Sequence, residues 1–123
     1  MDVATLSEAT GGTATFMLQN PGHAGKDYLI LGTLSGPSPG FPLPGGLTMP
    51  INWDLFTSVI VKNLGSPFLS GFLGTLDGNG DATAVLTAPA LPGLAGATMD
   101  FAYAQDGKVW DFVSNSVSIQ IVP

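Results

Sequence analysis

The chain has 123 residues, of which 45% are hydrophobic and only 10% charged, with nine acidic residues against three lysines and neither arginine nor cysteine. This length predicts one domain with one core over residues 1–123. So few basic residues exclude a phosphate-binding surface, and we therefore expect no nucleic-acid partner. The lack of cysteine excludes disulfides and thiolate metal sites, and no run reaches the roughly 18 apolar residues of a membrane span, so no membrane insertion is expected.

Short strands separated by turn signals are expected in the first half of the chain. A glycine pair at 11–12 separates a strand over 3–7 from one over 13–19, and the apolar run 28–34 is typical of a more fully buried strand. The segment 36–50 contains five prolines. Because proline cannot donate the N–H that a central strand needs, we expect an ordered crossover loop there that covers one end of the core.

The second half of the chain is expected to continue in strands. Residues 55–62 are expected to form one strand, and residues 69–76 and 81–88 are expected to pair as a hairpin. The joining sequence Asp-Gly-Asn-Gly at 77–80 favours such a tight turn, because glycine, aspartate and asparagine tolerate the backbone angles of hairpin turns.

A second hairpin is predicted between residues 98–105 and 108–113, joined through Asp-Gly at 106–107. In the last strand, Val117, Ile119 and Ile121 alternate with polar residues, which indicates one face on the core and one in water. Strands spaced in this way predict an all-β fold: an antiparallel β-sandwich, Ig-like or jelly-roll-like, of about eight strands with a Pro-rich crossover loop.

Several stretches together resemble a known domain. They run from the glycine pair at 11–12 through His23 and the Tyr-Leu-Ile-Leu run to 36, and continue at 43–48, 76–82 and 112–117. The chain resembles an uncharacterised β-rich domain found, often near the C-terminus, in secreted and surface proteins of large-genome Gram-negative bacteria. The resemblance implies a β-rich fold and an extracellular location, secreted or at the cell surface, and it carries no activity with it.

A calcium site is one interpretation of the 77–81 segment. Asp77, Asn79 and Asp81 place oxygen-bearing side chains two residues apart, as the first ligands of a calcium loop do. An EF-hand would need glycine at Ala82 and a bidentate glutamate at Ala88. A non-EF calcium site and a plain hairpin turn both remain open, and no cofactor other than calcium is expected.

A glycan-binding site is one interpretation of the residues after the Pro-rich loop. Trp53 lies between Asn52 and Asp54, so an exposed indole ring and neighbouring hydrogen-bonding groups could meet a sugar there. The alternative is that the aromatic ring packs within the fold, as aromatic residues at strand positions commonly do.

No set of residues predicts catalysis. The sequence Gly-Pro-Ser-Pro-Gly at 36–40 matches the letters of a hydrolase nucleophile elbow, but Pro39 has no N–H to donate to an oxyanion. His23 is the only histidine, and we expect it to stabilise its turn. We therefore expect a non-enzymatic extracellular module that is structural, adhesive or self-associating through edge strands, the alternative being a carbohydrate-binding module.

Overall fold

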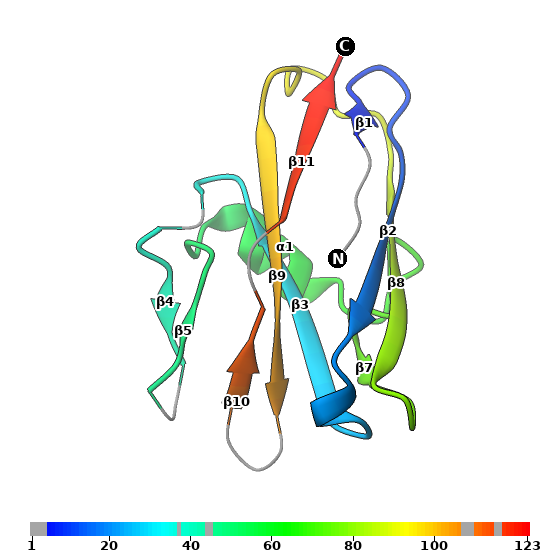
Figure 1. Cartoon of the computed structure of the whole chain (residues 1–123). Coiled ribbons are helices and arrows are strands. Elements are labelled where there is room, and N and C mark those ends of the chain that lie inside the picture. Colours follow the sequence, from blue (N-terminus) through cyan, green and yellow to red (C-terminus); the bar gives the residue numbers. More distant parts are fainter. Residues whose placement is uncertain (1–4, 37, 44–45, 107–109, 115–116) are drawn as a thin grey trace.

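The computed structural model of the chain describes residues 5–36, 38–43, 46–106, 110–114 and 117–123. The fold is mostly β, with curled multi-stranded sheets and one short α-helix (Figure 1). The expectation of an all-β fold is thereby confirmed.

Most of the described strands form a main sheet and a smaller sheet, and two short strands pair separately. The main sheet has the order β1-β11-β9-β3-β7, and β10 also pairs with β9. Its strands are β1 (Leu6–Ser7), β3 (Asp27–Thr33), β7 (Leu73–Thr75), β9 (Thr98–Asp106), β10 (Trp110–Val113) and β11 (Val117–Val122). The smaller sheet has the order β2-β8-β6, with β2 (Gly12–Gln19), β8 (Asp81–Ala88) and β6 (Leu69–Ser70).

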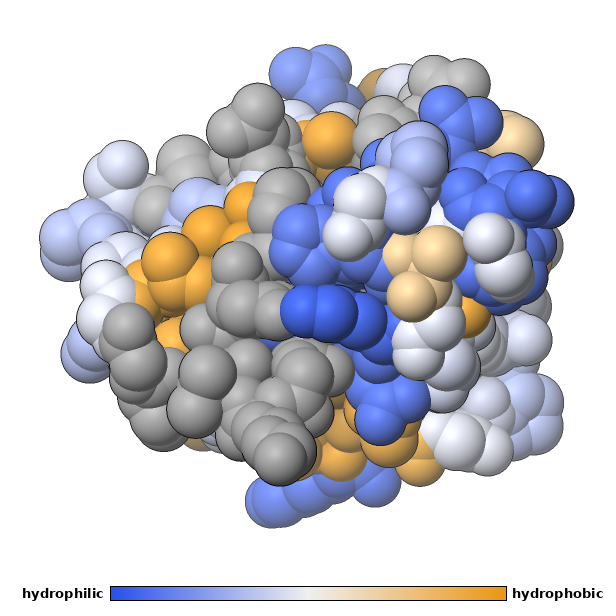
Figure 2. All heavy atoms as spheres, turned by 60° about the horizontal axis from the view of Figure 1, so that its bottom comes forward, coloured by the Kyte–Doolittle hydropathy of each residue, from blue (hydrophilic) through white to orange (hydrophobic). Residues whose placement is uncertain are grey.

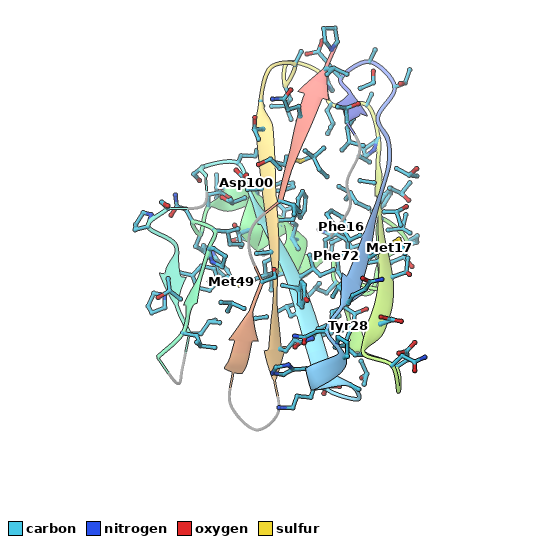
Figure 3. The ribbon with its side chains drawn as sticks, in the orientation of Figure 1. Phe16, Met17, Tyr28, Met49, Phe72 and Asp100 are labelled. Atoms are coloured by element: carbon cyan, nitrogen blue, oxygen red, sulfur yellow. The ribbon has the colours of Figure 1, made fainter. Side chains whose placement is uncertain are left out.

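Aromatic side chains join the two sheets in the core. The ring centroids of Phe16 on β2 and Phe101 on β9 lie 5.1 Å apart, and Phe16 meets Phe72 edge-on at 5.6 Å. Figure 3 shows Phe16 turned toward the interior and its neighbour Met17 turned outward. Strand β2 therefore has one buried face and one solvent-facing side, as strict alternation along a strand requires.

The Pro-rich segment stays outside both sheets. It contains the short strands β4 (Phe41–Pro42) and β5 (Thr48–Met49), which pair with each other. Figure 1 shows this hairpin on the flank of the main sheet, and on that side of the molecule Figure 2 shows a hydrophobic area at the surface. The Met49 side chain is buried, so the segment covers part of the core from the side of the main sheet.

The strand expected over 55–62 is wrong, because these residues form the helix α1 (Leu55–Lys62). Asp54 and Thr57 form a capping box at its start, in which each side chain accepts a hydrogen bond from the other residue's backbone N–H. Thr57 Oγ1 also donates to the carbonyl oxygen of Gly32 on β3 at 2.8 Å. The cap and the buried contact with β3 together favour a helix over the strand that the β-branched residues suggest.

The strand expected over 69–76 is also corrected. It is split into β6 and β7, which belong to different sheets. Gly71 lies between them with a φ of 73°, a conformation that glycine adopts without steric cost. The turn at 77–80 therefore connects β7 of the main sheet with β8 of the smaller sheet, and β8 pairs with β2 and β6.

The other expected hairpin is present. Strands β9 and β10 pair antiparallel, while residues 107–109 of their connection lie outside the described part of the chain. The last strand, β11, also agrees with expectation, since Ile119 and Ile121 are buried while Ser118 and Gln120 are exposed. Strand β11 pairs antiparallel with β9 and parallel with β1.

Candidate functional site

Asn52 holds the Pro-rich segment in place. Its Oδ1 accepts a hydrogen bond from the Gly40 N–H at 2.9 Å, and its Nδ2 donates to the carbonyl oxygens of Ser35 at 3.0 Å and Ser38 at 2.7 Å. Both polar atoms of the amide are thus engaged within the chain. A sugar at this position would compete with these internal hydrogen bonds.

Asp54 connects the start of α1 to the end of β3. Its Oδ1 accepts from the Thr57 N–H at 3.0 Å, and its Oδ2 accepts from Thr33 Oγ1 at 2.8 Å, the Leu34 N–H at 2.9 Å and Ser35 Oγ. Partial burial alone would raise the pKa of this carboxyl, but the hydrogen bonds from Ser35, Thr57, Thr33 and Leu34 together hold the pKa well below its usual range. At neutral pH the group is therefore an ionised acceptor that holds the start of α1 to the end of β3.

Trp53 presents a supported aromatic ring at the surface. The side chain is 51% exposed, its Nε1 donates to Ser58 Oγ at 3.1 Å, and its ring centroid lies 5.3 Å from that of Phe41 in an edge-on contact. Trp53, Asn52 and Asp54 are thus neighbours, but only the indole ring remains available to a ligand. The Trp53 ring is therefore an apolar platform, and the Asn52 and Asp54 side chains expected to hydrogen-bond a ligand beside it are engaged within the chain.

The 77–81 turn uses its first carboxylate to bind the backbone. Asp77 Oδ1 accepts from the N–H groups of Asn79 at 2.8 Å and Asp81 at 2.9 Å. The backbone N–H of Asp81, followed by that of Asn79, lowers the pKa of Asp77. Within the described ranges, no group of three or more His, Cys, Asp or Glu side chains is placed to hold a metal ion. A calcium ion here would share Asp77 with the turn.

His23 lies in the single turn of 3₁₀ helix η1 (Pro21–His23) that precedes β3. Its backbone N–H donates to the carbonyl oxygen of Asn20 at 2.9 Å and its own carbonyl accepts from the Lys26 N–H at 3.1 Å. The backbone of His23 therefore takes part in two successive turns, while the turn-stabilising role expected for its side chain stays a prediction.

A hollow with apolar walls opens between α1 and the end of the smaller sheet. Its volume is about 210 Å³, and Val59 and Phe68 at its rim are 52% and 53% exposed. Its lining consists of Phe56, Val59, Ile60, Asn63, Phe68, Leu69, Leu86, Ala88, Pro89, Leu91 and Met99. None of these side chains titrates, so the hollow offers burial for an apolar group and no acid–base chemistry.

The outer edge of β2 is a feature that no motif signalled. Asn20, which follows β2, donates its N–H to the carbonyl oxygen of Gly80 at 2.8 Å, one position beyond the register pair of Gln19 and Asp81. In an antiparallel pair, residues alternate between those hydrogen-bonded to the partner strand and those turned away from it. The even-numbered residues of β2 therefore face β8, and the N–H and C=O groups of Thr13, Thr15, Met17 and Gln19 face outward.

The register of β8 supports this alternation. Thr87 donates its N–H to the carbonyl oxygen of Phe68 at 2.9 Å, next to the register pair Leu69 and Leu86. The odd-numbered residues of β8 therefore face β6 and the even-numbered residues face β2, as the pairing of Phe16 with Ala84 requires. Among the hydrogen bonds of the described residues, none reaches the outward groups of β2.

Strand β2 differs from the other edge strands in length. Strands β1, β6, β7 and β10 have two to four residues, whereas β2 has eight. The sequence of β2, Gly-Thr-Ala-Thr-Phe-Met-Leu-Gln, contains no charge and no proline, and its register with β8 runs without a bulge. Short length, charge, proline and bulges are the means by which edge strands usually avoid pairing, and β2 has none of them.

Comparison with known proteins found no matching family model, no matching curated protein and no matching solved structure. In the described part of the chain, no helix has the length and apolar character needed to cross a membrane.

Proposed function

We propose that this chain is a non-enzymatic, self-associating β-sandwich module of a secreted or surface protein, and that copies join through the free edge of β2. The observation that carries the proposal is the eight-residue, uncharged edge of β2, whose outward groups have no hydrogen-bond partner among the described residues. An unpaired row of N–H and C=O groups is a template for another strand, and adding one satisfies those groups without any change in the core.

The composition supports association between identical copies. A strand without charged residues brings no like charges together when it meets a second copy of itself. The sandwich class is supported by the packing of Phe16 on the smaller sheet against Phe101 on the main sheet, with the two rings tilted by 52°. The extracellular location is supported by the resemblance described for the sequence.

The proposal is tested by sedimentation velocity from about 10 µM to about 1 mM, a range suited to weak association through one strand. We expect the average mass of the wild type to rise with concentration. Met17→Lys puts a charge on the β2 edge and should remain monomeric, whereas Thr83→Lys puts the same charge on the exposed face of the neighbouring central strand and should behave as the wild type. A monomeric wild type at all concentrations, or association unaffected by Met17→Lys, would refute the proposal.

A second candidate function is carbohydrate binding by Trp53, and the exposed ring supported by Phe41 favours it. A glycan array identifies the ligand, and Trp53→Ala should then abolish binding. Phe68→Ala is the matched control, because Phe68 is an exposed aromatic residue outside this platform. An array without hits, or equal binding by Trp53→Ala and the wild type, removes this function.

A further inference from the structure

The outward groups of β2 define how a second copy would pair with it, and this inference rests on the self-association proposed above. We propose that two copies pair antiparallel about a two-fold axis through Phe16, with Thr13 opposite Gln19 of the second copy and Thr15 opposite Met17 of the second copy. The partner is therefore the same strand of the same chain. The product is a closed dimer.

The register follows from the alternation of backbone groups. Only an outward residue of one copy can form a hydrogen-bonded pair with an outward residue of the other. The outward residues are Thr13, Thr15, Met17 and Gln19. When the first of these residues in one copy lies opposite the last in the other copy, all four form pairs. Each such pair exchanges two hydrogen bonds, which gives about eight across the interface. A shift by two residues in either direction leaves one outward residue of each copy without a partner.

The side chains are compatible with this register. The exposed side chains of β2 lie on the solvent side of the smaller sheet, so Thr15 meets Met17 of the second copy there, a β-branched residue beside a flexible apolar one. Ala14, Phe16 and Leu18 are buried in the core of their own copy. Pairing therefore requires no rearrangement of either core.

The direction of pairing follows from the two faces of the smaller sheet. A two-fold axis perpendicular to the sheet makes the strands antiparallel and keeps the solvent face of both copies on one side. An axis along the strands would make them parallel and would put the solvent face of one copy in line with the core face of the other. Only the antiparallel arrangement extends the sheet as one layer, in the order β6-β8-β2-β2-β8-β6.

The same geometry limits the size of the assembly. A two-fold interface uses the same edge in both copies, so neither β2 edge remains free after pairing. The edge at the far end of the extended sheet is β6, which has two residues. The assembly is therefore expected to stop at two copies and not to grow into a filament.

The register is tested by disulfide formation, which the absence of natural cysteines makes unambiguous. Thr15→Cys and Met17→Cys are made separately, and one of them is isotopically labelled so that mass spectrometry distinguishes mixed from self-linked dimers. Directly opposed residues of a hydrogen-bonded pair have Cα atoms about 5.5 Å apart, within the range that a disulfide spans, whereas diagonal neighbours lie beyond it. Under mild oxidation we expect the mixed dimer to form in at least about tenfold excess over either self-linked dimer.

Further variants provide a second pair and a control. Thr13→Cys mixed with Gln19→Cys should give the same result, and Thr83→Cys, exposed on the neighbouring strand, should not cross-link. Efficient self-linking of Thr15→Cys or of Met17→Cys overturns the register while self-association stands. Species larger than a dimer in sedimentation overturn the closed assembly. A chain that neither sediments as a dimer nor cross-links refutes the proposed function as well.

Discussion

Replacing Asp54 by alanine should destabilise the fold through the junction between α1 and β3. The change removes the N-cap of α1, which contributes about 0.5–2 kcal/mol in such positions. It also leaves Thr33 Oγ1 and the Leu34 N–H without their charged acceptor, and hydrogen bonds to charged groups contribute about 1.5–3 kcal/mol. Because these contributions overlap, we expect the free energy of unfolding to fall by about 2–3 kcal/mol at pH 7. Thr33 is fully buried, so water replaces the lost acceptor poorly.

The conservative variant separates the two contributions. Asparagine is as good an N-cap as aspartate, so Asp54→Asn should keep the bond to Thr57 and lose only the acceptor for Thr33, Leu34 and Ser35. Its loss should be smaller, about 1–2 kcal/mol. Asp81→Ala, measured without calcium, is the control for removing an exposed carboxylate and should change stability by less than about 0.5 kcal/mol. Urea unfolding followed by tryptophan fluorescence measures all three.

The pH dependence gives an independent check. The pKa of Asp54 in the folded chain lies below the unfolded value of about 3.9, so its ionised form stabilises the fold fully above that value. This stabilisation is lost as the pH falls below about 4 toward the lower folded pKa. The difference in stability between wild type and Asp54→Ala should therefore shrink between about pH 5 and about pH 2. A difference below about 0.5 kcal/mol at pH 7, or one that does not change with pH, would refute this account.

Three further changes test the core and the turn. Gly32→Ala should cost about 1–3 kcal/mol in a urea melt, because the added Cβ would lie 2.5 Å from the Phe101 ring and 3.0 Å from Ile60 Cδ1. Phe16→Ala should lower the free energy of unfolding by about 3–5 kcal/mol, because it opens a cavity between the sheets, and should leave the slope of that free energy against urea concentration unchanged. A loss below about 1 kcal/mol would contradict the central position of Phe16. Asp77→Ala should lower the melting temperature at pH 7, because the carboxylate accepts two backbone hydrogen bonds in its turn. The difference from the wild type should vanish in acid, once the Asp77 carboxyl of the wild type is protonated. Equal melting temperatures at pH 7 would show that the carboxylate does not hold its turn.

Alternation along single strands predicted much of the β structure, but it could not locate the helix. Residues 55–62 contain several β-branched side chains, which favour a strand. The signal for a helix was the pair Asp54 and Thr57, spaced as in a capping box. Residues 69–76 were divided at Gly71, whose positive φ redirects the chain from one sheet to the other. A local pattern shows that a strand forms and leaves open which sheet it joins.

For the candidate sites too, the sequence indicated local features but not contacts between distant residues. The sequence left open whether the Trp53 ring is exposed or packed within the fold, and in the structure the ring is 51% exposed. The sequence did not indicate that Asn52 and Asp54 would bind the chain itself, since their partners at 33–40 lie 12 to 21 positions away. The edge of β2 was equally hidden, because a free edge depends on which strands lie beside it.

The parallel pairing of β1 with β11 has a mechanical consequence. Leu6 lies opposite Ile121 and Ser7 opposite Val122, and the Glu8 N–H donates to the carbonyl oxygen of Val122. The chain enters β1 at one end of this ladder and leaves β11 at the other (Figure 1). A force that pulls the outer ends of the two strands apart therefore acts along the strand axis. The hydrogen bonds between the strands then bear this force together and do not break one after another. The pairing of β1 with β11 is thus loaded in shear, a geometry that suits a domain held at two points under force.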